Sequence, residues 1–277
     1  MLRAGDVVVS TRSKHGTTWL QTILLLLVHG PVDRWPAPLW QLSPWVDHLV
    51  EPIPAVVSRV SAQERRRVLK THTPLDGVPA VPGVWRIVVV RDPLDAAVSL
   101  YHQGSNLDRE RLAELTGSPS SIAGRAPLEE WLAAWVDEVA DPRARLDSLD
   151  GVLHHLTDAW GRRGDDDVVL LRYADLLTDL DEQMALLANR LGFGGPEAYG
   201  VEWPLLVEAA SFTAMRARAD HLAPDAGGVL RDPSAFFRRG LTGSGEASVP
   251  SPVMDRYRER LSMSLPADLQ AWLAGSA

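Results

Sequence analysis

The sequence contains no cysteine among its 277 residues. This absence excludes disulfide bonds, thiolate metal ligands and a cysteine nucleophile, and it leaves the redox compartment undetermined. Long apolar runs are also missing: the longest, residues 23–28, is far too short to span a bilayer. The N-terminus carries no signal-like apolar stretch. We therefore expect a cytoplasmic protein with no integral membrane segment.

Lysine is nearly absent as well. Of the 28 basic residues only Lys14 and Lys70 are lysines, and the others are arginines. An ammonium group is a compact point charge on a flexible stem, whereas a guanidinium group is a planar fork, so the two do not substitute for each other at a precise site. The two lysines are therefore candidate functional residues. The alternative is that these two lysines remain by chance.

Positive charge is not in excess. The chain has 28 basic and 36 acidic residues and a net charge of −8, which argues against a general nucleic-acid binder. Hydrophobic residues make up 45% and charged residues 23%, as in a folded globular protein. The length is sufficient to bury a substantial core.

The apolar pattern predicts an α/β fold. Four short apolar runs have the composition of buried strands: residues 6–10, 67–70, 85–90 and 168–172. Helical patterns lie between and after them, at residues 19–29, 94–102, 127–139, 152–162 and 180–191. Continuous apolar strands separated by helices predict a parallel sheet covered on both faces. We expect a single α/β domain over residues 1–277.

Three stretches have the composition of long loops, namely residues 31–54, 104–126 and 216–245. The first is rich in proline and contains Trp35, Trp40 and Trp45. Long loops in a compact domain are often functional, and a tryptophan-rich one suits the wall of an apolar substrate pocket. The alternative is that these tryptophans pack the loop onto the body of the protein.

The loop after the first strand is a candidate anion site. Gly16 allows close approach of the backbone at a helix N-terminus, Thr17 and Thr18 add hydroxyl groups, and Lys14 adds positive charge. The pattern differs from a Walker P-loop, in which the lysine follows the second glycine instead of preceding it. The alternative is a purely structural loop.

A second polar segment, residues 70–74, follows the second strand and contains Lys70 and His72. Ligands of open α/β sheets bind at the carboxyl ends of the strands, so we expect this segment to share one crevice with Lys14. His72 suits a general base because the pKa of a free histidine lies near neutrality. The alternative is a histidine that only hydrogen-bonds the loop.

Two further segments carry arginines suited to phosphate. Arg91 ends the strongest strand, and Ser99 follows about two helical turns along the next helix. The alternative for Arg91 is a salt bridge to Asp92 or Asp95. Residues 236–240 couple two phenylalanines to two arginines and a glycine, which suits a second phosphate or an adenine ring.

In this order and context, the segments resemble those of the cytosolic-type sulfotransferases. That family transfers a sulfuryl group from 3′-phosphoadenosine-5′-phosphosulfate (PAPS) to a hydroxyl or amine. The resemblance covers residues 6 to 240 and rests on six segments: 12–19, 70–72, 91–102, 171–176, 211–215 and 238–240. It implies the three-layer, P-loop-like sandwich that sulfotransferases share with nucleotide kinases.

The resemblance also implies residue roles. His72 would act as base, Lys14 and Lys70 would neutralise charge on the transferred group, and Ser99 would complete the catalytic set. The nucleotide would be bound by Lys14, His15, Gly16, Thr17, Thr18, Trp19, Arg91, Ser99, Tyr173, Ser211, Phe212, Met215, Phe237, Arg238, Arg239 and Gly240.

No metal is implied, because the protein itself supplies the positive charge. The nearest metal-ligand candidate, His154 and His155 with Asp158, we interpret as a helix surface. The partner would be a small-molecule acceptor, apolar, aromatic or a natural product, that offers a hydroxyl in preference to an amine. The arginine bias is typical of a GC-rich bacterial source.

The sequence departs from the family pattern at several positions. Ser13 replaces the loop proline, His15 a serine, Ala210 a threonine and Arg239 a lysine. Residues 243–245 replace the usual Gly-Asp-Trp, and the short dimerisation motif is not recognisable between residues 246 and 255, which leaves the oligomeric state open.

Two other functions compete with this interpretation. A P-loop kinase-like phosphotransferase needs a lysine after the loop glycine and a strand-end aspartate for magnesium, for which Asp92 is the nearest candidate. A catalytically inactive nucleotide-binding relative would keep the fold without the chemistry, yet both lysines and His72 are present.

Overall fold

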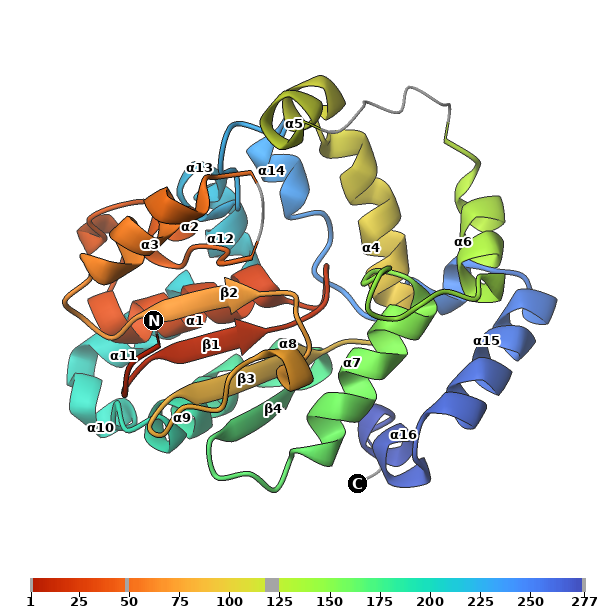
Figure 1. The fold of residues 1–277 in the computed structure, drawn as a ribbon. Helices are drawn as coiled ribbons and strands as arrows, with labels where there is room; N and C mark the ends of the chain where they lie inside the picture. The colour runs from red at the N-terminus through yellow and green to blue at the C-terminus, as the bar shows by residue number, and fades with distance from the viewer. Residues whose placement is uncertain (1, 48–49, 118–124, 276–277) are drawn as a thin grey trace.

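The centre of the molecule is a parallel sheet (Figure 1). The computed structural model describes residues 2–47, 50–117 and 125–275. Four strands lie in the order β2-β1-β3-β4. Their bounds are β1 Val7–Ser10, β2 Val68–Thr71, β3 Trp85–Val90 and β4 Val168–Arg172. All neighbouring pairs are parallel, with Val9 opposite both Lys70 and Ile87. The strands lie where the apolar runs predict them.

Helices cover both faces of the sheet, which confirms the expected α/β architecture. Alternate residues of β3 point to opposite sides, so that Ile87 and Val89 join one core and Val88 and Val90 the other. The first core is covered by α1 (Thr17–His29), α8 (Tyr173–Thr178), α9 (Leu180–Arg190) and α11 (Trp203–Ala209). The second is covered by α4 (Pro93–Asn106), α6 (Leu128–Asp137), α7 (Leu149–Gly161), α15 (Ser251–Ser264) and α16 (Ala267–Leu273).

Helix α1 is buried along almost its whole length, since every residue from Thr17 to Leu27 is buried. It begins at Gly16 with a φ of 104° and ends at Gly30, whose N–H donates to the Leu26 carbonyl at 2.8 Å. Glycine suits both ends because it adopts positive φ without steric cost. The helix therefore starts directly at the end of the phosphate-type loop.

The long loops that the sequence predicts contain short helices, so this expectation is corrected. Toward the top of Figure 1 lie α2 (Leu39–Leu42), α3 (Ile53–Ser61), α5 (Arg109–Thr116), α12 (Phe212–Ala217), α13 (Ala219–Leu222) and α14 (Pro233–Phe236). The four-residue helices are too short to show a helical period, and α5 buries no residue. Residues 48–49 and 118–124 of the predicted loops lie outside the described part.

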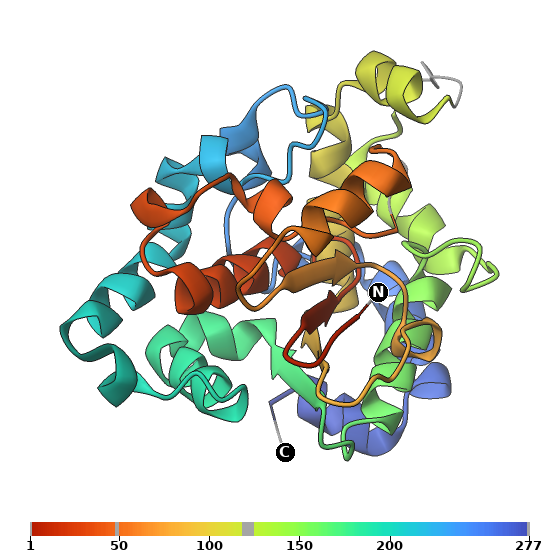
Figure 2. The same ribbon diagram turned by 60° about the vertical axis from the view of Figure 1, so that its left-hand side comes forward.

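The C-terminal helices α15 and α16 pack beside α7, on the side away from α9 to α11 (Figures 1 and 2). The sequence analysis did not predict them, because α15 is mostly polar and buries only Val253, Met254 and Tyr257. The Tyr257 hydroxyl donates to Asp92 at 3.1 Å, which ties α15 to the start of α4.

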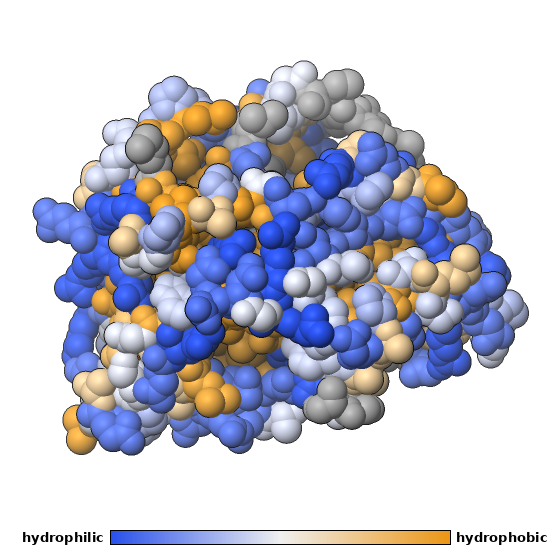
Figure 3. Space-filling view, turned by 60° about the horizontal axis from the view of Figure 1, so that its bottom comes forward, coloured by the Kyte–Doolittle hydropathy of each residue, from blue (hydrophilic) through white to orange (hydrophobic). Residues whose placement is uncertain are grey.

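The face shown in Figure 3 is dominated by hydrophilic side chains, with apolar residues scattered in small groups. Scattered surface apolar residues are normal for a folded domain. Within the described residues, each helix is too short or too polar to cross a bilayer. The short α10 (Pro196–Tyr199) completes the helices on the side of α9 and α11.

Candidate active site at the carboxyl ends of the strands

A cavity of about 350 Å³ opens at the carboxyl ends of the strands. It brings together most of the residues that the sequence analysis selected. The lining includes Lys14, Gly16, Thr17, Thr18, Trp19, Lys70, His72, Arg91, Ser99, Tyr173, Phe212, Met215, Phe237, Arg238, Arg239 and Gly240. These residues come from loops that follow β1, β2, β3 and β4 and from the C-terminal third of the chain, so only the fold unites them.

The loop after β1 has an unusual backbone. Lys14 has a φ of 65° and is the one described non-glycine residue with a positive φ. Gly16 has a φ of 104°, and a Cβ there would lie 2.9 Å from the ring of Tyr173. Such a conformation costs energy and persists only where the surroundings enforce it. The strained loop places Lys14 and the start of α1 against the cavity.

Both lysines are buried in the cavity wall. The Lys14 ammonium lies 3.7 Å from the centroid of Phe236 and 3.4 Å from Gln103 Oε1. Burial, followed by the nearby charge of Arg91, lowers the pKa of Lys14 to about 7. The Lys70 ammonium lies 3.9 Å over the Trp45 ring, and burial lowers its pKa to about 8. The cavity thus concentrates positive charge that an anion would stabilise.

Arg91 crosses between two segments of this site. Its guanidinium donates to the carbonyl of Lys14 at 3.3 Å and to that of Leu241 at 2.6 Å. The alternative salt bridges to Asp92 or Asp95 are not among the contacts of the described residues. Arg91 Nε is buried without a described hydrogen-bond partner, and so is Arg238 Nε. Two arginine nitrogens therefore remain to be satisfied by a ligand or by water.

Asp95 fixes the turn that follows Arg238 and Arg239. Its carboxylate accepts from the Gly243 N–H at 2.8 Å and from the Gly245 N–H at 2.7 Å. Gly240 has a φ of 62° and packs so closely on the Phe212 ring that no Cβ fits. The buried carboxylate thus holds the arginine segment beside Arg91, although the usual Gly-Asp-Trp of the family is replaced here.

His72 is oriented by the backbone. Its Nδ1 makes a hydrogen bond to the Thr11 carbonyl, and because a carbonyl only accepts, Nδ1 carries the proton. Nε2 is then the proton-accepting atom of the neutral ring. Burial, followed by the charge of Lys70, lowers the pKa of His72 well below its usual value. The histidine therefore both bonds the loop and presents a neutral imidazole at the cavity.

Aromatic rings form part of the cavity wall near the cationic residues. Trp19 meets Tyr173 edge to face at 5.2 Å between centroids, and its indole N–H donates to the Ala210 carbonyl at 2.8 Å. Phe212 and Phe237 lie 6.4 Å apart, also edge to face. At position 210 it is therefore the backbone, and no side-chain hydroxyl, that contacts Trp19.

Two selected residues do not line the cavity. His15 is buried behind the loop, where its Nδ1 donates to the Ser13 carbonyl at 3.1 Å, and burial lowers its pKa to about 4. Ser211 caps α12, since its hydroxyl accepts from the Ala214 N–H at 3.2 Å. Both side chains serve the local structure in the absence of ligand.

The interpretation of His154 and His155 as a helix surface is wrong for His155. That side chain is buried, and its Nε2 lies 3.1 Å from the Ser10 hydroxyl. His154 lies 3.3 Å from the Asp76 carboxylate, and Asp158 accepts from the Asp76 N–H at 2.8 Å. Helix periodicity alone did not reveal that α7 turns His155 toward β1. Among the described residues, no group of three or more His, Asp or Glu side chains is placed to hold a metal.

The other end of the cavity is apolar and was largely missed by the sequence analysis. Its lining includes Leu39, Trp40, Trp45, Val50, Leu100, Leu107, Leu112, Val229, Leu230 and Phe236. Trp40 and Trp45 belong to this wall, whereas the Trp35 indole donates to the Gly30 carbonyl at 2.9 Å and packs on the core. Both alternatives for the tryptophan-rich stretch are therefore realised, each by different residues.

Trp45 is fixed beside His72. The backbone on either side of Trp45 pairs with Lys70 like an added strand, with N–O distances of 2.9 and 3.0 Å. The Trp45 and His72 rings lie 4.4 Å apart, edge to face. Asp47 then accepts from the hydroxyls of Thr71 and Thr73, which ties the same segment to the end of β2.

The comparison with known proteins agrees with this geometry. A family model described as a sulfotransferase domain matches residues 4–259. Glycolipid sulfotransferases of Mycobacterium bovis and Mycobacterium tuberculosis are each 35% identical to the chain, over 98% of this chain and 88% of the relative. Sulfotransferase 1A1 of Canis lupus familiaris is 25% identical, over 91% of this chain and 80% of the relative.

Solved structures share the fold. A retinol dehydratase in complex with androsterone and the inactive cofactor PAP matches with a TM-score of 0.71 and 19% identity, over 96% of this chain and 82% of that chain. A mouse sulfotransferase complexed with PAP matches with a TM-score of 0.69 and 19% identity, over 100% of this chain and 90% of that chain.

Proposed function

The chain belongs to the sulfotransferase family, and we propose that it transfers a sulfuryl group from PAPS to a hydroxyl group of a small acceptor. The observation that carries the proposal is the presence of two neighbouring cationic groups in the lining of one cavity. Lys14 and the N-terminus of α1 form one group, and Arg91, Arg238 and Arg239 form the other. Two such groups suit a nucleotide with phosphates on both its 5′ and 3′ positions.

The residues present fit this donor. Buried, unpartnered Nε atoms on Arg91 and Arg238 are suited to the 3′-phosphate, with Ser99 and Gly240 alongside. Lys14 and the amides at the start of α1 are suited to the 5′-phosphate. Trp19 and Phe212, with Tyr173 nearby, offer aromatic faces to the adenine. His15 and Ser211 would support this site from behind, through the loop and α12.

The proposed chemistry is a single in-line transfer. His72 Nε2 takes the proton from the acceptor hydroxyl while the acceptor oxygen bonds to sulfur. The bond from sulfur to the 5′-phosphate oxygen breaks, and adenosine 3′,5′-bisphosphate (PAP) leaves. Lys14 and Lys70 stabilise the charge that develops on the transferred group and on the leaving oxygen. The depressed pKa of His72 keeps the base neutral at physiological pH.

The apolar end of the cavity supports an acceptor with a largely apolar or aromatic body. Its only acidic lining residues among the described ones are Glu51 and Asp147, and Glu51 is paired with Arg59 at 2.5 Å. The glycolipid sulfotransferases among the relatives support a natural-product or lipid-like alcohol. We also propose that the protein is cytoplasmic and that the transfer needs no metal ion. Residues 1–277 would act as one domain.

The kinase-like alternative finds less support. Asp92, its candidate magnesium ligand, accepts from the Asp95 N–H at 2.9 Å as the cap of α4 and from the Tyr257 hydroxyl at 3.1 Å. Burial raises the pKa of Asp92, which disfavours the charged form that magnesium needs. The aspartate therefore serves the helix start and α15.

A thermal-shift comparison of PAP, ADP and Mg-ATP tests the function. A ligand at about 100 times its dissociation constant stabilises a fold by ~2.7 kcal/mol, and we expect this from PAP alone. Arg238→Ala is the matched variant. Its affinity for PAP should fall by about tenfold or more, whereas its thermal shift with ADP should stay that of the wild type. Stabilisation by Mg-ATP without PAP would contradict the proposal. Turnover of PAPS then separates an enzyme from an inactive relative.

A further inference from the structure

The phosphate-type loop, residues 11–16, contains a buried charge that the proposed chemistry does not use. The Arg12 side chain is 1% exposed, and its three guanidinium nitrogens have no hydrogen-bond partner among the described residues. Arg12 is not part of the cavity lining. A buried cation without a nearby anion is strongly destabilising, so the charge on Arg12 must be balanced by its surroundings.

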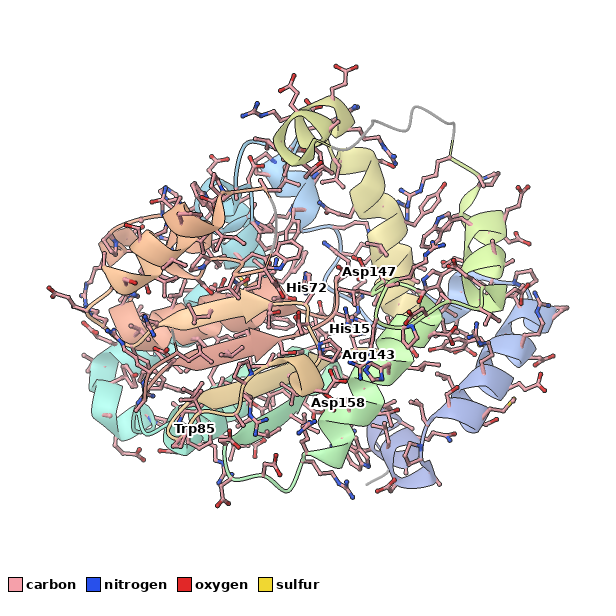
Figure 4. The ribbon with its side chains drawn as sticks, viewed as in Figure 1. His15, His72, Trp85, Arg143, Asp147 and Asp158 are labelled. Carbon is pink, nitrogen blue, oxygen red and sulfur yellow. The ribbon has the colours of Figure 1, made fainter. Side chains whose placement is uncertain are left out.

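Asp147 supplies part of this balance. Its carboxylate accepts from the Ser13 hydroxyl at 2.9 Å, at the residue next to Arg12. Burial lowers the pKa of Arg12 to about 10, and among the carboxylates that oppose this effect Asp147 acts most strongly, ahead of Asp47 and Asp76. Figure 4 shows Asp147 near the N-terminal end of α7, in the same part of the view as the labelled His72 and His15.

The carboxylate stands on a rigid support. The carbonyl of Asp147 accepts from the Trp135 indole N–H at 2.8 Å. The next residue, Ser148, caps α7, and its hydroxyl accepts from the Gly151 N–H at 3.0 Å. Farther along α7, His155 reaches the Ser10 hydroxyl. Helix α7 therefore touches the last residue of β1, and Asp147, just before the helix, reaches the loop itself.

Ser13, which Asp147 contacts, is adjacent to Lys14, the residue with the strained backbone. Ser13 precedes Lys14, whose φ of 65° is unfavourable for a side chain with a Cβ. On the far side the loop is held by Gly16 against Tyr173 and by the Thr11–Thr17 hydroxyl pair. The hydrogen bond from Ser13 to Asp147 therefore acts together with the contacts of Arg91 to the Lys14 carbonyl and of His15 to the Ser13 carbonyl, and its loss would weaken the support of the positive φ at Lys14.

We propose that Asp147 is a positioning residue, which holds Ser13 by a hydrogen bond so that the strained loop keeps Lys14 and the start of α1 in place for the donor nucleotide. This inference rests on the proposed function. Asp147 does not need to touch the nucleotide. Because it also lines the cavity, the competing role is direct contact with the acceptor, which the experiment separates.

The test measures PAP affinity by calorimetry and the KM values for PAPS and acceptor, in wild type, Asp147→Ala, Ser13→Ala and the double variant. Loss of a hydrogen bond to a charged group is worth about tenfold in affinity. We expect Asp147→Ala to weaken PAP binding and raise the KM for PAPS by about that factor, with the acceptor KM unchanged. Ser13→Ala should show part of the loss, and the double variant no more than Asp147→Ala, because both remove one bond.

Asp141→Ala is the matched control. Asp141 lies in the same segment between α6 and α7 and is exposed, and its carboxylate accepts from the Arg143 N–H at 2.9 Å without contacting residues 11–16. It should behave as wild type. Ser13→Ala keeps the test informative if Asp147→Ala does not fold. Unchanged PAP affinity in both variants, or a change confined to the acceptor KM, overturns the inference. A wild type that does not bind PAP refutes the proposed function itself.

Discussion

The two ends of the cavity are built in different ways. The cationic end consists of residues that follow strand ends together with Arg238 and Arg239, which follow α14, and their positions are set by backbone contacts such as Arg91 to the carbonyls of Lys14 and Leu241. The apolar end is formed by short helices and connecting segments, for example α2 and α5, whose inner residues Leu39 and Leu112 line it. The first end is fixed by the sheet, whereas the second is free to vary with little effect on the sheet.

This difference has a functional consequence. Under the proposed function, residues at the cationic end would act on groups that every donor nucleotide of this class carries, so their loss should affect all acceptors equally. Residues at the apolar end would contact the acceptor and should change specificity without changing the donor affinity. Lys70 and His72 lie between the two ends, covered by Trp45. Variants at each place should therefore give separable kinetic signatures.

The largest effect is expected between the two ends, at the base. His72→Ala removes the proton acceptor and should lower kcat by about 10²- to 10⁴-fold, the usual contribution of a general base. PAP affinity should stay within about twofold of wild type, because His72 is not among the residues proposed to bind the phosphates and the Thr11 backbone is also held by its N–H bond to the Thr71 carbonyl. Single-turnover kinetics with PAPS, together with PAP titration, measure both quantities. Near-wild-type turnover would show that another group takes the proton.

A smaller effect is expected in the pH dependence of PAP affinity, which should involve the cationic end and not the apolar end. Lys14 and Lys70, with pKa values of about 7 and about 8 in the free protein, should be held charged by a bound bisphosphate. Binding must then take up protons above pH 7, so that PAP affinity falls by up to about tenfold per pH unit for each lysine. Below pH 6 both lysines are already charged and uptake at these two groups should vanish. Calorimetry in buffers of different ionisation enthalpy counts the protons.

The control for this prediction is Lys14→Met, which should remove the part of the uptake that begins near pH 7. The sign for stability is the reverse of that for binding. Because the pKa of each folded lysine lies below the unfolded value of 10.5, the unfolded chain binds more protons above pH 7. The free energy of unfolding of the unliganded protein should therefore gain from these groups as pH rises from 7 toward 10. An acceptor that binds without PAP should cause no proton uptake at the two lysines. Proton uptake on acceptor binding would contradict the division of the cavity into a cationic end and an apolar end.

The strands and the long helices were predicted better from the sequence than the short helices and the C-terminal helix α15. The strands at 7–10, 68–71, 85–90 and 168–172 were readable because buried parallel strands are short, continuous apolar runs. The long helices with an apolar stripe, such as α7, were also predicted. Helices of four residues and the polar α15 were not, since their packing depends on partners far away in the chain, such as Asp92 for Tyr257.

The same contrast holds for the site. The cationic residues were predictable because phosphate chemistry demands a few residue types at fixed places after strands. Phe236, which covers the Lys14 ammonium, belonged to the recognised segment 236–240 and yet was not assigned to the nucleotide-binding residues. Asp147 and Gln103 had no local signal at all, because each acts through a contact with residues 13–14 that is distant in sequence. The assigned roles at the cationic end stay predictions until tested.

The smallest effect is expected at the apolar end, with Trp40→Ala. Trp40 lines the cavity, and the guanidinium of Arg59, which pairs with Glu51, lies 5.2 Å from the centroid of its ring. Removing the indole takes away roughly 40 Å² of apolar contact from an acceptor, worth ~1 kcal/mol or about fivefold in KM. The donor affinity and the proton uptake should not change, because Trp40 contacts neither lysine. KM values for a series of alcohols of increasing size measure the effect, and bulkier acceptors should lose less than small ones because they fill the space left by the indole. If PAP affinity fell while the acceptor KM rose, the two ends of the cavity would be coupled through the Trp45 segment rather than independent.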